Sequence, residues 1–267
     1  MFSVPRLRDI RNGSERRVRA ADGEEFTLFL VHHAGGSAVS FLPLRSVFPD
    51  HWRVLATELP GRGASIGEPA CSGMAEAVSW LLPAVRAEIT GPYAVVGHSM
   101  GALVARELVR ELEAAGTPPV LLGVSASPAP HLSGQDGRYR NLRTREQLVR
   151  FLKDLGGTPD EVFEQPDLMD YLIEILRSDL AVLESYERSA GPVSVPIAVY
   201  YGERDAAAHR EIVEPWSEYS TAYTTVTSWP GGHFYLFDHA ETFGARLAHD
   251  VREAAAARVP HRESVWE

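Results

Sequence analysis

The sequence is poor in cysteine, in net positive charge and in long apolar runs. Cys71 is the single cysteine among 267 residues, which excludes a disulfide framework and a thiolate metal cluster and fits a reducing cytosol. The net charge of −10 disfavours nucleic-acid binding, because that function usually needs a basic face. No apolar run reaches membrane-spanning length, and residues 1–8 lack the apolar core of a signal peptide. We therefore expect a cytoplasmic protein that binds neither nucleic acid nor membrane.

Motifs for metal and nucleotide chemistry are missing as well. The chain has no zinc-protease helix motif, no phosphate-binding P-loop and no strand that leads through Gly-x-Gly-x-x-Gly into a helix. His32 and His33 are adjacent, but neighbouring side chains on an extended segment point in opposite directions. No third ligand stands at a telling spacing. We expect no metal and no cofactor, and we assign structural or cavity-lining roles to the two histidines.

The most informative stretch is residues 93–102, which read Tyr-Ala-Val-Val-Gly-His-Ser-Met-Gly-Ala. An apolar, β-prone segment leads through Gly-x-Ser-x-Gly into a long helical pattern, which is the strand–turn–helix context of a nucleophile elbow. In so tight a turn, side chains two positions either side of the serine would clash, and Gly97 and Gly101 remove them. Ser99 is therefore the predicted nucleophile, with the positive end of a helix pointing at it.

Strands and helices alternate along most of the chain, which predicts an α/β protein with a mostly parallel sheet covered on both faces. Apolar runs predict strands at residues 26–31, 52–56, 93–96, 120–124, 197–201 and 224–228. Apolar spacing predicts helices at residues 41–48, 74–89, 100–115 and about 240–257. We expect a single domain at 26–258, after a leader at 1–25 that is partly flexible or adds an edge strand, and before a frayed tail at 259–267.

Between about residues 131 and 189 the alternation stops. This segment shows two or three helical patterns and no strand, and Gly-Gly-Thr-Pro at 156–159 separates two of them. An all-helical insertion between two strands, above the carboxyl edge of the sheet, is typical of a lid over an active site. A helical cap without a gating role remains the alternative.

Three residues match the arrangement that serine catalysis requires. A serine hydroxyl is a weak nucleophile at neutral pH, so it needs a base within reach and an acid that orients the base. In α/β-hydrolases these follow in the order Ser, Asp or Glu, His, each just after a strand. Ser99, Asp205 and His233 have that order and context. Glu203 is a rival acid closer to the strand end, and we interpret Asp179 as a solvated charge on a helix of the insertion.

A second loop could supply the oxyanion site. Residues 32–38, His-His-Ala-Gly-Gly-Ser-Ala, follow the first predicted strand, as the oxyanion loop does in this fold class. The backbone N–H groups of Ala34 and Met100 are the predicted donors to the oxyanion.

Taken together, these segments resemble a type II (editing) thioesterase, the stand-alone enzyme associated with modular polyketide and nonribosomal peptide synthases. The resemblance extends from about Leu28 to the closing helix and rests on residues 33–38, 59–63, 97–101, 155–159 and 231–234. It implies an α/β-hydrolase fold and hydrolysis of acyl thioesters on the phosphopantetheine arm of an acyl or peptidyl carrier protein, through an acyl-serine. A monomer is expected.

The chain departs from the family pattern at two places. His32 stands where the family usually has proline, and residues 206–208 are Ala-Ala-Ala where a proline is common nearby. Neither departure removes a member of the predicted triad.

Because carrier proteins are typically acidic, docking requires a local basic patch. Four arginines near the start of the insertion are candidates: Arg138, Arg140, Arg143 and Arg145. A solvated charged face is the alternative.

Three other functions remain open. A general carboxylesterase or lipase would share the triad and the fold. An acyltransferase would pass the acyl group from serine to an alcohol or amine. A non-catalytic ligand-binding module is disfavoured, since a pure binder has no chemical need for all three triad residues.

Overall fold

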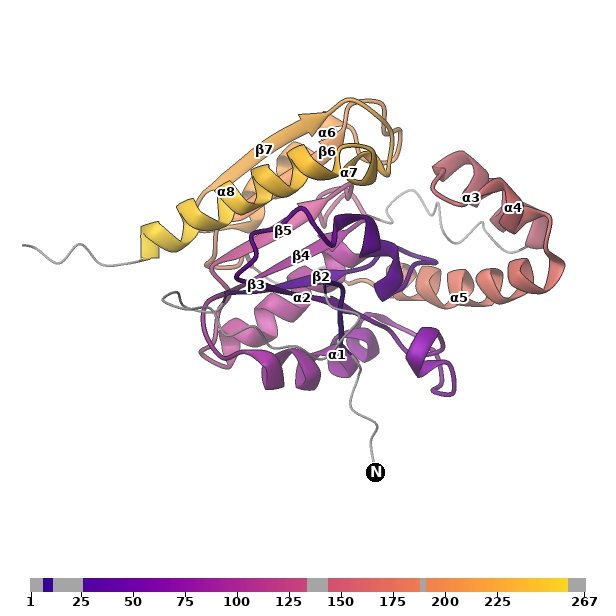
Figure 1. Cartoon of the computed structure of the whole chain (residues 1–267), viewed down its shortest axis with the longest axis horizontal. Coiled ribbons are helices and arrows are strands. Elements are labelled where there is room, and N and C mark those ends of the chain that lie inside the picture. Colours follow the sequence, from indigo (N-terminus) through magenta and orange to yellow (C-terminus); the bar gives the residue numbers. More distant parts are fainter. Residues whose placement is uncertain (1–6, 12–25, 134–143, 188–190, 259–267) are drawn as a thin grey trace, which may run out of the picture.

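The computed structural model describes residues 7–11, 26–133, 144–187 and 191–258 (Figure 1). Within these ranges the strands form one sheet of seven, in the order β1-β3-β2-β4-β5-β6-β7. Their bounds are β1 (Leu7–Asp9), β2 (Phe26–Val31), β3 (Trp52–Thr57), β4 (Tyr93–His98), β5 (Leu121–Ser125), β6 (Ile197–Gly202) and β7 (Thr224–Trp229). The six strands expected from the apolar runs are all present, which confirms those predictions.

Four of the inner strands of the sheet are buried along their whole length. Every residue of β2, β4, β5 and β6 is buried, as expected for parallel strands covered by helices on both faces. β1 pairs antiparallel with β3 at the edge, with Leu7 opposite Thr57. Part of the predicted leader therefore adds an edge strand, while residues 1–6, 12–25 and the predicted tail lie outside the described residues.

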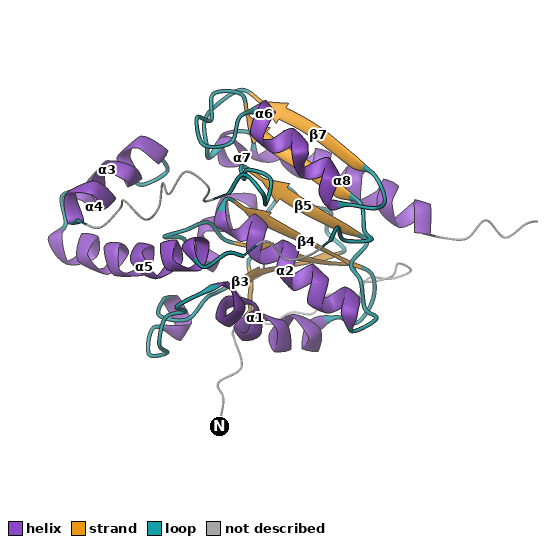
Figure 2. Cartoon of the chain, turned by 180° about the vertical axis from the view of Figure 1, so that it is seen from behind, coloured by secondary structure: helices purple, strands orange, loops and turns teal. Residues whose placement is uncertain are grey.

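Helices cover the two faces of the sheet, as the alternation of strands and helices predicts. α1 (Met74–Glu88) and α2 (Met100–Ala114) pack together on one face, and α8 (Ala240–Arg258) lies with η1 (Ala38–Leu44) on the other (Figures 1 and 2). The helix expected at 41–48 is confirmed only in part: a 3₁₀ helix begins earlier, at Ala38, and ends at Leu44. Pro43 lies inside it and cannot donate the backbone hydrogen bond that an α-helix needs there.

The register of the parallel strands brings their carboxyl ends together. Val31 pairs with Gly97, and Gly97 pairs with Val124. Farther along, Gly202 pairs with Trp229. The loops that follow these strands therefore meet at one edge of the sheet, which is where binding sites of open α/β sheets are found.

The described residues between β5 and β6 contain helices and no regular strand. They form α3 (Arg145–Leu155), α4 (Asp160–Phe163) and α5 (Pro166–Glu184), which we call the helical insertion. Figure 2 shows it standing beyond the carboxyl ends of the strands. Thr144 caps α3 with its side chain, and Gly156 ends it with a positive φ of 78°.

The remaining helices are short and lie in loops. They are η2 (Gly63–Ser65), α6 (Arg210–Val213), η3 (Glu214–Tyr219) and α7 (Tyr235–Asp238). Among the described helices, none combines the length and the apolar character needed to cross a membrane.

Candidate active site

Ser99 occupies a strained turn between β4 and α2. Its φ of 57° and ψ of −119° lie in a region that residues with a side chain rarely adopt. The Ser99 amide donates to the carbonyl of Ser125 at the end of β5, at 2.7 Å, so the neighbouring strand holds the turn. Such strain raises the serine above the sheet, as in a nucleophile elbow.

The glycines on either side of Ser99 are required by close backbone contacts. A Cβ placed on Gly97 would lie 1.9 Å from the carbonyl oxygen of Gly101. A Cβ placed on Gly101 would lie 2.2 Å from the carbonyl oxygen of Val31 in β2. Both distances are far shorter than any carbon–oxygen contact, so the steric reason predicted for these two glycines is confirmed.

Asp205 and His233 form a buried hydrogen-bonded pair, and His233 lines the same cavity as Ser99. Asp205 follows β6 and His233 follows β7, and their side chains meet with His233 Nδ1 2.7 Å from Asp205 Oδ2. The two residues are only 3% and 5% exposed, respectively. The other carboxylate oxygen accepts from the amide of Ala207 at 2.8 Å, so the Ala-Ala-Ala segment after β6 holds the acid by its backbone.

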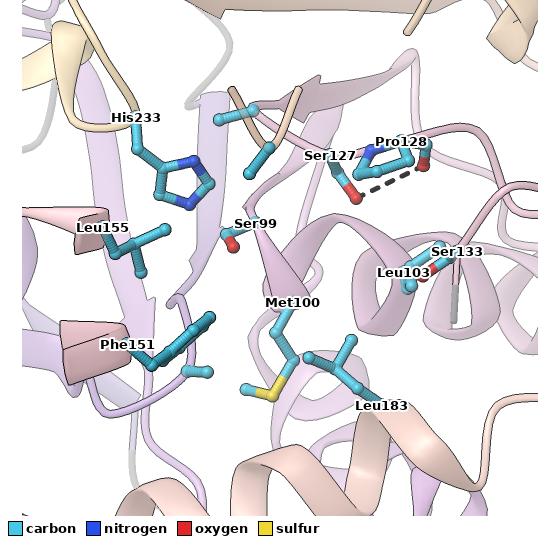
Figure 3. A pocket seen from close by; sticks show the side chains of 13 residues that line it. Ser99, Met100, Leu103, Ser127, Pro128, Ser133, Phe151, Leu155, Leu183 and His233 are labelled. Atoms are coloured by element: carbon cyan, nitrogen blue, oxygen red, sulfur yellow. Dashed lines mark hydrogen bonds between the residues drawn. The ribbon is translucent and has the colours of Figure 1, made fainter. Parts of the chain in front are cut away.

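This pairing leaves the second ring nitrogen of His233 available. Because Asp205 accepts from Nδ1, the ring is fixed in the tautomer whose Nε2 can accept a proton. Nε2 is buried and has no hydrogen-bond partner within the described ranges. Figure 3 shows the ring pointing toward Ser99. A general base needs one ring nitrogen free for the proton that it accepts, and Nε2 meets that requirement.

The two rival acids have other partners. Glu203 is exposed and accepts from the hydroxyl of Ser228. The interpretation of Asp179 as a solvated helix charge is wrong: this residue is fully buried and pairs with Arg62. The apolar spacing of α5 held a signal, because Asp179 stands four positions after Ile175 and four before Leu183, on the buried face of the helix. Arg62 stands in the turn at 59–63, which is one of the segments that resemble type II thioesterases. Its place in that turn is the sequence signal that could have pointed to a function for this residue.

The two amides predicted to bind an oxyanion belong to residues that line the same cavity as Ser99 and His233. Met100 is the first residue of α2, so its N–H has no carbonyl of the same helix to bond. The described residues provide no acceptor for the amide of Ala34. Two unpaired N–H groups beside a strained serine could together stabilise a negative oxygen.

The cavity is narrow and mostly apolar. Its volume is about 30 Å³, and Leu103 from α2 lies in its wall. Phe151 and Leu155 of α3 and Leu183 of α5 complete the wall, so the helical insertion forms part of the cavity (Figure 3). This lining could hold a small acyl group away from water.

Two further histidines, His33 and His98, lie near the His233–Asp205 pair and stay neutral at neutral pH. Burial lowers the pKa of His33 to about 4, an effect that the nearby His233 reinforces. Burial also takes the pKa of His98 well below its ordinary value, with His233 and His33 contributing. His98 is held by a hydrogen bond of its Nδ1 with the Ser125 hydroxyl at 2.9 Å. No second imidazolium therefore opposes the charging of His233.

His32, which replaces the usual proline of the family, has a structural role. It is fully buried, and its Nδ1 lies 2.8 Å from the carbonyl oxygen of His33. Its Nε2 accepts from the amide of Leu59 at 3.4 Å. The ring therefore joins the end of β2 to the end of β3.

The structure places one of the four arginines predicted to dock a partner. Arg138, Arg140 and Arg143 lie outside the described residues. Arg145 is the first residue of α3 and pairs with Asp170 of α5 at 2.9 Å, and both side chains are exposed. An exposed pair of this kind contributes little to stability.

Comparison with known proteins identifies the family. Residues 26–250 match the Thioesterase domain family. The gramicidin S biosynthesis protein GrsT of Aneurinibacillus migulanus is 32% identical over 213 residues, covering 79% of this chain and 83% of that protein. Thioesterase TesA of Mycobacterium marinum is 31% identical over 217 residues, covering 79% and 84%.

A solved structure agrees with the sequence relatives. The type II thioesterase BorB from the borrelidin biosynthetic cluster superimposes with a TM-score of 0.79 at 33% identity, covering 89% of this chain and 97% of that one. With the parallel sheet and its flanking helices, this similarity confirms the predicted α/β-hydrolase fold. The chain belongs to the thioesterase family, whose members are hydrolases that act on thioesters.

Proposed function

We propose that this chain is a type II thioesterase that removes acyl groups from the phosphopantetheine arm of carrier proteins in polyketide or nonribosomal peptide synthesis. The observation that carries the proposal is the buried His233–Asp205 pair: His233 lines one cavity with Ser99, and its Nε2 has no hydrogen-bond partner among the described residues. The relatives support the substrate class, because GrsT is a gramicidin S biosynthesis protein and BorB is a type II thioesterase from a biosynthetic cluster.

In the proposed reaction, the Ser99 oxygen attacks the thioester carbonyl carbon while His233 Nε2 accepts the serine proton. The carbonyl oxygen becomes an oxyanion held by the amides of Ala34 and Met100. The carbon–sulfur bond then breaks, and the pantetheine sulfur leaves with the proton from His233. Asp205 keeps the ring in the required tautomer and stabilises its charged form.

Water completes the cycle. His233 Nε2 removes a proton from water as the water oxygen attacks the acyl-Ser99 carbonyl. The second oxyanion collapses, the acid is released, and the proton returns to Ser99. The narrow apolar cavity favours a short acyl group, and we propose that the helical insertion acts as the lid that encloses it.

We further propose that the acidic carrier docks at the start of α3, where Arg145 lies exposed. Arg145→Glu should raise KM for a carrier-bound substrate by about fivefold and leave KM for a small thioester unchanged, because surface charge acts mainly on encounter. Arg86→Glu is the matched control, since Arg86 is exposed near the end of α1, which precedes β4, and so lies toward the opposite edge of the sheet. An unchanged KM in Arg145→Glu would argue against docking there.

The proposed function is tested by presenting one acyl group in three forms: a p-nitrophenyl ester, an N-acetylcysteamine thioester and a carrier-protein thioester. The proposal predicts the highest kcat/KM for the carrier-bound form and no turnover by Ser99→Ala. Equal or better ester turnover would indicate a general carboxylesterase. An acyl-enzyme released by an added alcohol or amine, and not by water, would indicate an acyltransferase.

We also propose that the protein works in the cytoplasm as a monomer. The net charge of −10 and the single buried cysteine are compatible with that location. Sedimentation at micromolar concentration would detect a dimer and so contradict the monomeric state.

A further inference from the structure

Arg62 and Asp179 form a charged pair in the interior of the protein. Arg62 is 1% exposed and Asp179 is 0% exposed. The two terminal nitrogens of Arg62 donate to the two oxygens of Asp179 at 2.7 and 2.6 Å, in a parallel fork. Burial raises the pKa of Asp179, and the bonds from Arg62 partly offset that rise. A buried charged pair often adds little net stability, because removing the two charges from water costs about as much as their attraction returns. The presence of this pair therefore needs an explanation other than stability.

The same pair holds the loop that follows β2. Asp179 Oδ2 also accepts from the amide of Gly35 at 2.7 Å. Arg62 also donates to the carbonyl of Gly36 at 3.0 Å. Gly35 has a positive φ of 77°, so the loop adopts a conformation that other residues would resist. The pair thus joins this loop to the turn at 59–63 and to α5.

These bonds fix the direction of the Ala34 amide. The carbonyl of His33 accepts from the amide of Gly36 at 3.0 Å, which closes a turn over Ala34 and Gly35. In a trans peptide the carbonyl and the following N–H point in opposite directions, so a held His33 carbonyl sets the Ala34 N–H. Asp179 engages the neighbouring Gly35 amide, so of these two amides only that of Ala34, a residue that lines the cavity, has no acceptor among the described residues.

We propose that Arg62 and Asp179 are positioning residues that hold the Ala34 amide in the oxyanion site. This inference rests on the proposed function, because it concerns the same reaction. Asp179 belongs to α5, whose Leu183 lines the cavity. The pair therefore fixes the oxyanion loop to a helix of the insertion, and the site is complete only when α5 is in place.

A double-substitution cycle separates positioning from stability. Arg62→Met and Asp179→Leu each leave one buried charge unpaired and should lower the unfolding midpoint in urea, whereas the double variant should recover most of it. If the pair positions the amide, the double variant keeps a kcat about 10- to 100-fold below wild type, with KM changed by less than about threefold. If the pair is only structural, kcat returns with stability.

The inhibition constant of a transition-state analogue reports on the oxyanion site and does not depend on the stability of the folded protein. A trifluoromethyl ketone analogue of acyl-pantetheine adds the Ser99 oxygen to its carbonyl carbon, the serine proton goes to His233, and the resulting oxyanion occupies the site. Its inhibition constant should rise in the double variant by the same factor as kcat falls. A thioether analogue, which cannot form the adduct, should bind equally to wild type and variant.

Arg106→Met is the matched control. Arg106 is also fully buried, but its partners include Tyr186 and the carbonyl of Gly191, away from the oxyanion loop. It should lose stability without changing the ratio of inhibition constant to KM. Arg62→Lys provides a second variant, because lysine keeps the charge but cannot reach Asp179 and Gly36 through a planar fork, so kcat should fall about tenfold.

The outcomes distinguish the inference from the function on which it rests. A folded wild-type protein that hydrolyses no thioester and forms no ketone adduct would overturn the proposed function and this inference together. An active wild type whose double variant and Arg62→Lys variant both keep kcat and the inhibition constant would overturn the inference alone.

Discussion

Replacing Gly97 by alanine tests whether backbone packing dictates the elbow. The new Cβ would lie 1.9 Å from the carbonyl oxygen of Gly101, against a closest carbon–oxygen approach of roughly 3.3 Å. The backbone around Ser99 must therefore shift by roughly 1 Å, which puts the cost at the upper end of overpacking, about 3 kcal/mol. For a domain of this size the unfolding temperature should fall by roughly 6–12 °C.

Activity should fall with stability, since a displacement of this size at the proposed nucleophile costs about 100-fold in kcat. Gly67→Ala is the matched control, because a Cβ there meets nothing within 4 Å. It should stay within about 0.5 kcal/mol of wild type. Urea unfolding and thioester hydrolysis on the two variants provide the comparison. A Gly97→Ala protein as stable and as active as Gly67→Ala would refute the steric reasoning.

Three further predictions concern the groups around the site. Asp205→Asn should lower kcat by about 10⁴-fold, because the ring of His233 is then no longer held in the tautomer whose Nε2 accepts a proton. Glu203→Gln should keep the wild-type kcat. Equal losses in the two variants would contradict the assignment of Asp205 as the acid. Burial lowers the pKa of His33 from an ordinary 6.5 to about 4 in the folded protein, so the unfolded chain takes up this proton first as the pH falls. The stability that is present above pH 6.5 is therefore lost as the pH falls toward 4, and the loss is about 3 kcal/mol. Urea midpoints should therefore show a flatter acid dependence in His33→Gln, and an unchanged slope would oppose this reading. Burial raises the pKa of the Cys71 thiol to about 11. Iodoacetamide at pH 8 should therefore modify Cys71 far more slowly in folded than in urea-unfolded protein, as followed by mass spectrometry. Equal rates would show an accessible thiol.

Much of the fold and of the candidate site could be predicted because the signals are local. Apolar runs bounded by turns marked the inner strands, and the glycines around Ser99 indicated a tight turn. Asp205 and His233 each follow a strand of a parallel sheet, so chain order alone placed them at one edge. The topology rule thus supplied the long-range information.

The parts that could not be predicted depend on contacts without such a rule. Asp179 and Arg62 are separated by 117 positions, and an acid on an amphipathic helix is usually solvated. The leader was expected to be partly flexible or to add an edge strand, but Leu-Arg-Asp has no strand signature that places β1 within it; backbone pairing with β3 does so. The 3₁₀ helix at Ala38–Leu44 follows the apolar spacing of a helix, but the effect of Pro43 outweighs that pattern.

The most direct test of the central claim is to trap the acyl-enzyme. Wild-type protein mixed with an acyl-carrier thioester and quenched in acid within milliseconds should carry the mass of the acyl group on the peptide that contains Ser99. The signal should be absent in Ser99→Ala, which should also release no free acid. An acyl group found on another residue, or hydrolysis by Ser99→Ala at the wild-type rate, would contradict the account.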